Sequence, residues 1–190
     1  MAERDREPLA FLQRVWENTQ GASSVGFKMT RGQNDVVMRS LIGDAGVLKI
    51  VLYRKNRVKT FVSEQLARQT DRWEVYARDK LATNTPTLHV DVESFKAHCD
   101  LNERFYQDIQ NALHSGQQPW IETAYEEILT APEHVRLLEF LGVEATDARL
   151  THSSIKQSDS DLRTHIENFR ELELAFEGSE YLAELYDYEN

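Results

Sequence analysis

Hydrophobic residues in the first 70 positions recur with two different periods, which predicts alternating strands and helices. Residues 47–53 (VLKIVLY) form a nearly continuous apolar run, typical of a strand that is covered on both faces. Val58, Val62 and Leu66 then recur at four-residue intervals, so a helix should follow directly. The elements predicted in this half are a helix from Pro8, a strand at 23–29, a helix at 34–46 capped near Asn34, the strand at 47–53 and the helix through Leu66. Such alternation is the pattern of an α/β layer with right-handed crossovers.

The second half of the chain is predicted to be mostly helical. Residues 71–92 mix aromatic and charged residues with a Thr/Asn/Pro cluster, and we expect an excursion over the surface there. From Phe95 onward, apolar residues step by four and three until Gly116, which predicts a long helix. The remaining predicted elements are a strand at 119–125, a helix from Pro132 to Gly142 with Val135, Leu138 and Leu141 inward, a polar loop at 151–161, a helix through Leu162, Ile166, Phe169 and Leu172, and a short helix at 181–186. No repeat or linker divides the chain, so we expect a single domain over residues 1–190.

Composition and charge narrow the classes of function. The formal net charge is −10 and the isoelectric point is near 5.1, which argues against broad binding to nucleic acid or to anionic membranes. Cys99 is the only cysteine, so no disulfide can form within the chain. No stretch approaches the length of about 18 apolar residues that a membrane span needs, and the first ten residues lack the apolar core of a signal peptide. We therefore expect a cytoplasmic protein without a membrane span.

Positive charge is concentrated just after the predicted strand at 47–53. Arg54, Lys55, Arg57 and Lys59 lie within six positions, and the hydroxyl of Ser63 follows in the next helix. Ligands of open α/β sheets collect at the carboxyl ends of the strands, and the following helix offers free N–H groups to an anion. Arg54, Lys55 and Ser63 could thus clamp a phosphate. The same cations could also be solvated, although cations in a first turn oppose the helix dipole unless an anion neutralises them.

This segment, residues 48–70 (LKIVLYRKNRVKTFVSEQLARQT), resembles the sulfotransferases that use 3′-phosphoadenosine 5′-phosphosulfate (PAPS). In that family an apolar strand is followed by Arg, Asn and then Ser, and the Arg and the Ser eight residues later hold the 3′-phosphate. Here Ser63 lies eight residues after Lys55 and nine after Arg54. The resemblance therefore implies that Lys55, with Arg54 beside it, and Ser63 contact the 3′-phosphate of PAPS or of its product, adenosine 3′,5′-bisphosphate.

Three further segments resemble the same family in the same order. Residues 121–143 are similar to its strand ending in Tyr-Glu-Asp and the helix closing in Phe-Leu-Gly, which implies that Tyr125 lies near the adenine. Residues 153–185 resemble the C-terminal region of bacterial nodulation-type sulfotransferases, where a Lys-Gln pair precedes an Ile-x-Asn-(Tyr/Phe) helix. The matching lysine, Lys156, would be a further phosphate contact. Residues 25–35 also resemble a strand and turn of this group.

The resemblance implies a three-layer α/β fold, with a parallel sheet flanked by helices as in P-loop nucleotide hydrolases. Its activity would be the transfer of sulfuryl from PAPS to a hydroxyl of a carbohydrate, lipid or small-molecule acceptor. Members of the family begin with a strand, a Gly/Ser/Thr-rich phosphate loop and a helix, and no such loop occurs here. We therefore expect a domain that is incomplete at its N-terminus, and no catalytic base can be assigned.

Two other classes of function are alternatives to a sulfotransferase. The first is a non-catalytic nucleotide-binding or interaction protein with the same fold, which would form a homo-oligomer or bind a partner through an exposed sheet edge. The second, a small-molecule kinase, is less favoured because the sequence has no Walker lysine. None of the six histidines forms a ligand-spaced pair, so no metal site is predicted.

Overall fold

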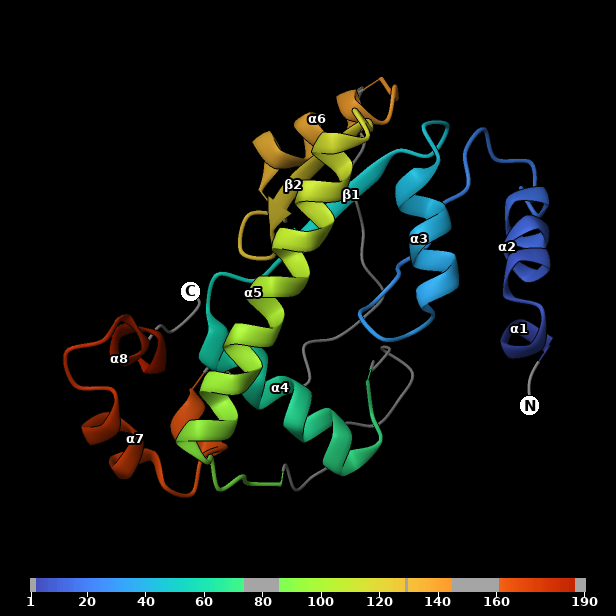
Figure 1. The fold of residues 1–190 in the computed structure, drawn as a ribbon. Helices are drawn as coiled ribbons and strands as arrows, with labels where there is room; N and C mark the ends of the chain where they lie inside the picture. Colours follow the sequence, from blue (N-terminus) through green and yellow to red (C-terminus); the bar gives the residue numbers. More distant parts are fainter. Residues whose placement is uncertain (1–2, 74–85, 129, 145–160, 187–190) are drawn as a thin grey trace. The chain divides into compact units, whose positions relative to one another are not determined.

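The computed structural model describes residues 3–73, 86–128, 130–144 and 161–186, which form a mixed α/β structure (Figure 1). Its two strands pair in parallel in a two-stranded sheet. The elements are α1 (Glu3–Arg6), α2 (Pro8–Glu17), α3 (Asp35–Gly43), β1 (Lys49–Tyr53), α4 (Arg57–Thr70), α5 (Val92–Ser115), β2 (Trp120–Ala124), α6 (Ala131–Phe140), the 3-10 turn η1 (Leu162–Thr164), α7 (Phe169–Ala175) and α8 (Glu180–Leu185). The helices predicted from Pro8, after Asn34, through Leu66, from Phe95 and from Pro132 are therefore confirmed, as are the strands at 47–53 and 119–125.

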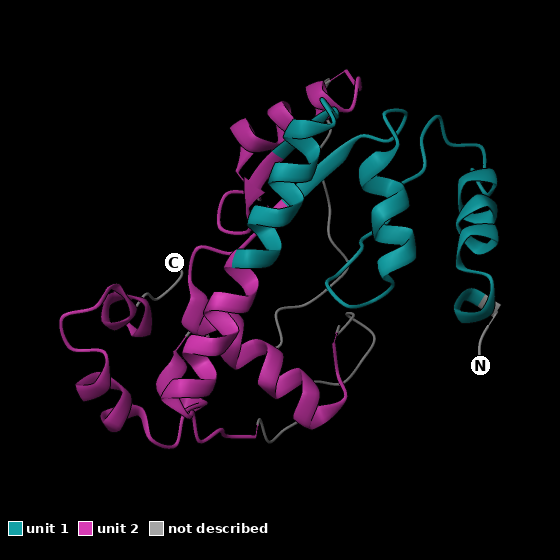
Figure 2. Cartoon of the chain, in the orientation of Figure 1, with its two compact units in different colours: residues 1–51, 104–121 teal, residues 52–103, 122–190 magenta. Residues whose placement is uncertain are grey.

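The chain groups into two compact units, each built from two separate stretches (Figure 2). Unit 1 comprises Met1–Val51 and Arg104–Ile121, and unit 2 comprises Leu52–Glu103 and Glu122–Asn190. The residues predicted to bind a nucleotide belong to unit 2.

Unit 1 contains α1, α2, α3 and the beginnings of both strands. The side chain of Asn34 accepts a hydrogen bond from the N–H of Val37 at 3.0 Å, which satisfies a free donor of the first turn and fixes the start of α3. The prediction of a strand at 23–29 is wrong, because this segment has no strand partner among the described residues. Phe27 instead packs its ring against Trp16, with 5.2 Å between the ring centroids.

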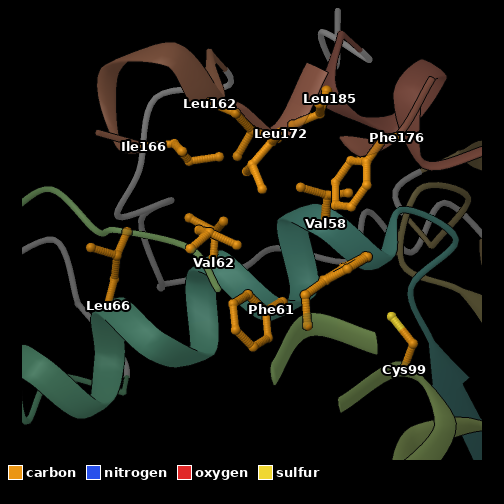
Figure 3. Close-up of a cluster of buried hydrophobic side chains, with 12 residues drawn as sticks. Val58, Phe61, Val62, Leu66, Cys99, Leu162, Ile166, Leu172, Phe176 and Leu185 are labelled. Carbon is orange, nitrogen blue, oxygen red and sulfur yellow. The ribbon is translucent and has the colours of Figure 1, made fainter. Parts of the chain in front are cut away.

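The core of unit 2 lies between α4, the start of α5 and the C-terminal segment (Figure 3). Phe95 is completely buried, and its ring meets those of Phe61 at 5.7 Å, Phe176 at 5.1 Å and Tyr181 at 4.9 Å. The buried residues of this core are Val58, Phe61, Val62, Leu66, Val90, Phe95, Cys99, Leu162, Ile166, Leu172, Phe176 and Leu185. Because α4 supplies four of them on one face, the position of α4 depends on both α5 and the C-terminal segment.

The single helix predicted through Leu162, Ile166, Phe169 and Leu172 is wrong. A 3-10 turn capped by Asp161 is followed by a parallel bridge between Ile166 and Leu88, and α7 begins only at Phe169. The side chain of Asn168 accepts from the N–H of Val90 at 2.8 Å and donates to its C=O at 2.9 Å. These long-range bonds are favoured over a continuous helix because they satisfy the N–H and C=O groups of Val90, which is buried.

The inward face predicted for α6 is only partly correct. Leu137 and Leu138 are buried, whereas Val135 and Leu141 remain about 40% exposed. Glu133 lies on the covered side, where Arg136 holds its carboxylate at 2.6 and 2.9 Å and also donates to the C=O of Glu122. The ion pair therefore takes part in joining α6 to β2, a role that the sequence pattern had given to apolar residues alone.

Candidate functional site

The cationic segment Arg54–Lys59 forms the junction between β1 and α4, and we call it the β1–α4 junction. Asn56 fixes its shape from a buried position. Its side-chain oxygen accepts from the N–H of Lys59 at 2.8 Å, and its amide nitrogen donates to the backbone oxygen of Glu184 at 2.8 Å. The first contact starts α4 at Arg57, and the second ties this start to α8. Asn56 is thus the helix cap of the junction.

At the strand end of the junction, Arg54 and Tyr125 come together. The N–H of Tyr125 donates to the C=O of Tyr53 at 2.7 Å, so Tyr125 follows β2 beside the end of β1. The guanidinium carbon of Arg54 lies 4.9 Å from the centroid of the Tyr125 ring, within the range of a cation–π contact. Lys55, the next residue, is exposed. Three of the five predicted site residues therefore gather at the neighbouring ends of two parallel strands.

Two adjacent glutamates after β2 face the same cations. Both carboxylate oxygens of Glu126 accept from the N–H of Lys55 at 3.1 Å, and one accepts from the N–H of Asn56 at 3.4 Å. The same carboxylate lies 3.9 Å from Nε of Arg54. Glu127 instead accepts from the ammonium of Lys55, and this bond raises the pKa of Lys55. The positive charge at the strand end is therefore balanced by carboxylates of the protein itself.

The helix end of the junction is occupied by Glu184 of α8. One carboxylate oxygen accepts from the N–H groups of Arg57 at 2.6 Å and Val58 at 3.2 Å, and the other accepts from Nε of Arg57 at 2.8 Å. Arg57 also donates to Glu180 and lies 4.5 Å from the centroid of the Tyr181 ring. The bonds to Glu180 and Glu184 raise the pKa of Arg57. The anion that a first-turn cation requires is here a side chain 127 residues away.

The other predicted site residues are less closely associated with this group. Ser63 lies on the exposed side of α4, about 9 Å along the helix axis from Arg57 at the standard rise per residue. Lys59, a cation of the junction that was not predicted as a site residue, is buried in α4. Lys156 lies outside the described residues. The structure thus brings Arg54, Lys55 and Tyr125 together, and it leaves Ser63 one to two turns further along α4.

The sequence did not point to the acidic partners of these cations. Glu126 and Glu127 could have been noticed as the two residues that follow Tyr125, within the segment that resembles the family. Glu184 carried no signal, because it stands in an acidic C-terminal stretch that is typical of a solvated helix.

Two other kinds of feature are absent from the part of the chain that the structure describes. No group of three or more His, Cys, Asp or Glu side chains is placed to hold a metal ion there. None of the helices in residues 3–73, 86–128, 130–144 and 161–186 is both long enough and apolar enough to cross a membrane.

The chain shows a weak similarity to a known protein. The chain is 26% identical, over 136 residues, to a protein named nodulation protein H from Rhizobium tropici. The match covers 70% of this chain and 53% of the relative, so the chain spans about half the length of the curated relative it matches. No protein-family model matches the chain. No solved structure matches it either.

Proposed function

We propose that the chain is a sulfotransferase-like α/β domain that binds adenosine 3′,5′-bisphosphate and PAPS at the carboxyl ends of β1 and β2. One observation carries this proposal: the guanidinium of Arg54 lies over Tyr125, with Lys55 beside them, at adjacent ends of two parallel strands. Such strand ends are where open α/β sheets bind ligands. The similarity to nodulation protein H supports the proposal, because the sequence motifs resemble the nodulation-type sulfotransferases.

The residues present suit the 3′-phosphate end of this nucleotide. Arg54 and Lys55 would supply positive charge, Ser63 a hydroxyl donor and Tyr125 an aromatic face for the adenine. Lys156 would be a further phosphate contact. Bound PAPS would supply a sulfuryl group for transfer to a hydroxyl of a carbohydrate, lipid or small-molecule acceptor. The sequence has no glycine-rich loop for the 5′-phosphosulfate, so transfer would need such a loop from outside these 190 residues. The three-layer fold and the single domain over residues 1–190 remain predictions.

A titration of adenosine 3′,5′-bisphosphate by calorimetry tests this site. The double variant Lys55→Ala/Ser63→Ala should bind at least tenfold more weakly, since each charge-assisted hydrogen bond is worth roughly 1.5–3 kcal/mol. Lys96→Ala is the matched control, because Lys96 is as exposed as Lys55 and also pairs with a glutamate. No binding by the unaltered protein, or equal binding by the double variant, would reject the proposal.

A second candidate function is a non-catalytic nucleotide-binding or interaction protein. It is favoured by the internal neutralisation of the junction, where Glu127 pairs with Lys55 and Glu184 with Arg57. This candidate predicts no sulfuryl transfer even when a phosphate-loop segment is supplied, and it predicts self-association. Light scattering coupled to size-exclusion chromatography would measure the latter, and a monomer at all concentrations would count against it.

A further inference from the structure

Glu126 and Glu127 are adjacent in sequence, but they hold the strand-end cations in different ways. The Glu126 side chain is 20% exposed and binds the backbone: its carboxylate accepts from the N–H groups of Lys55 and Asn56. It also lies 3.9 Å from Nε of Arg54. A single carboxylate therefore connects the loop after β2 to the residues that follow β1. Its hydrogen bonds hold the backbone at Lys55 and Asn56, and its charge lies close to the guanidinium of Arg54.

Glu127 makes no comparable backbone contact in the described residues. Its carboxylate pairs with the ammonium of Lys55, and the two side chains are 50% and 54% exposed. An exposed pair between flexible side chains gains little free energy, because water and salt screen it and both side chains lose rotamer freedom. The pair can therefore open at low cost. Glu126 has several acceptor bonds to lose, whereas Glu127 has one.

We propose that Glu126 is a positioning residue for the 3′-phosphate site and that Glu127 is its exchangeable counter-ion, which the phosphate of the ligand replaces on Lys55. This inference rests on the proposed function. Glu126 holds the backbone of Lys55 and the guanidinium of Arg54 where a phosphate can reach both. Glu127 neutralises Lys55 until the ligand arrives.

The exchange also defines the chemical class of the ligand. A phosphate monoester carries a charge of about −1.5 to −2 at pH 7, whereas a carboxylate or a sulfate ester carries only −1. Replacing Glu127 with a second monoanion leaves the charge at Lys55 unchanged, so there is no electrostatic gain. Replacing it with a phosphate monoester adds negative charge between Lys55 and Arg54. The pair with Glu127 thus selects terminal phosphates over singly charged anions.

Long-range electrostatics alone makes a different prediction. Glu126→Gln and Glu127→Gln each remove one negative charge from neighbouring positions. If only the net charge near the site mattered, both variants would bind an anionic nucleotide more tightly by similar factors. If Glu126 is a positioning residue, Glu126→Gln instead binds the 3′-phosphate nucleotide more weakly, whereas Glu127→Gln still binds it more tightly.

The experiment compares two nucleotides that differ in the 3′-phosphate. Adenosine 3′,5′-bisphosphate and adenosine 5′-monophosphate are titrated into the unaltered protein and into both variants, and the ratio of the two affinities is measured. Glu127→Gln should raise this ratio by about two- to fivefold, the range expected for loss of an exposed ion pair. Glu126→Gln should lower it by about tenfold, as expected for loss of charged hydrogen bonds. A general loss of stability would weaken the binding of both nucleotides equally and leave the ratio of their affinities unchanged.

Glu126→Asp separates geometry from charge. It keeps the negative charge but withdraws the carboxylate by one methylene group, so the ratio should fall although the net charge is the same. Thermal melts establish which variants are folded, and amide exchange should show lost protection at Lys55 and Asn56 in the Glu126 variants only. If neither Glu126 variant folds, the affinity ratio of Glu127→Gln tests the inference by itself. An unchanged ratio in that variant rejects the replacement of Glu127 by the phosphate.

The outcomes separate this inference from the proposed function. Binding of the bisphosphate by the unaltered protein, with a ratio that rises equally in both Gln variants or stays constant in folded Glu126 variants, overturns the inference and leaves the proposed function standing. No binding of either nucleotide by any of the proteins rejects the proposed function and the inference with it.

Discussion

Replacing Glu184 with alanine should destabilise unit 2 by removing the anion at the start of α4. The carboxylate is only 14% exposed and accepts bonds from two first-turn N–H groups and from the guanidinium of Arg57. A hydrogen bond to a charged group contributes roughly 1.5–3 kcal/mol, and removing one partner of a buried ion pair costs about 3–5 kcal/mol. Because the Arg57 side chain is 34% exposed and water can solvate it after the change, we take a lower value. The expected loss of unfolding free energy is about 2–3 kcal/mol.

Urea denaturation followed by circular dichroism at 222 nm measures this loss. With a slope of about 2 kcal/mol per molar urea, the midpoint should fall by roughly 1–1.5 M. Glu180→Ala is the matched control: Glu180 lies on the same helix and also bonds to Arg57, but its side chain is 71% exposed and caps no N–H group among the described residues. Its midpoint should stay close to that of the unaltered protein. Equal midpoints for the two variants would refute the reasoning, because they would show that Glu184 is no more than a surface counter-ion.

The remaining predictions concern other parts of unit 2. Asn168→Ala leaves the buried N–H and C=O of Val90 without their side-chain partner. The free energy of unfolding should therefore fall by about 2–3 kcal/mol, as measured by urea denaturation. An unchanged urea midpoint would contradict this prediction. Burial raises the pKa of the Cys99 thiol to about 11, so a disulfide reagent at pH 8 should label the native protein slowly and the urea-unfolded protein fully; rapid native labelling would contradict it. Hydrogen bonds from Arg136 lower the pKa of Glu133 to about 2 from an ordinary value of 4.5. Its contribution to stability is therefore complete above pH 4.5 and lost as the pH falls toward 2, so urea midpoints should fall less over this range in Glu133→Gln; equal acid sensitivity would argue against the pair.

Several elements could be predicted because neighbouring residues determine them. The cap at Asn34, the four-residue spacing through Leu66 and the long helix from Phe95 depend on contacts between residues three or four positions apart. The expected strand at 23–29 failed because a strand also needs a partner, which sequence alternation does not supply. The expected helix after Leu162 failed because Asn168 bonds to Val90, 78 residues away.

The candidate site could likewise be predicted only in part from the sequence. Its cations follow one strand within a few residues, so their density was visible in the sequence and pointed to an anion site. The sequence could not show which anion these cations contact. Glu126 lies about 70 residues beyond Lys55, and Glu184 lies 127 residues beyond Arg57.

The sequence by itself determined where five of the helices and both paired strands lie, and where positive charge collects, because these features depend on residues close together in the chain. Only the tertiary structure decided which of these charges are already neutralised. A carboxylate reaches the N–H groups of α4 or Lys55 only after β2 has paired with β1 and the C-terminal segment has packed its apolar side chains onto α4. The electrostatic character of the site is therefore a consequence of long-range packing.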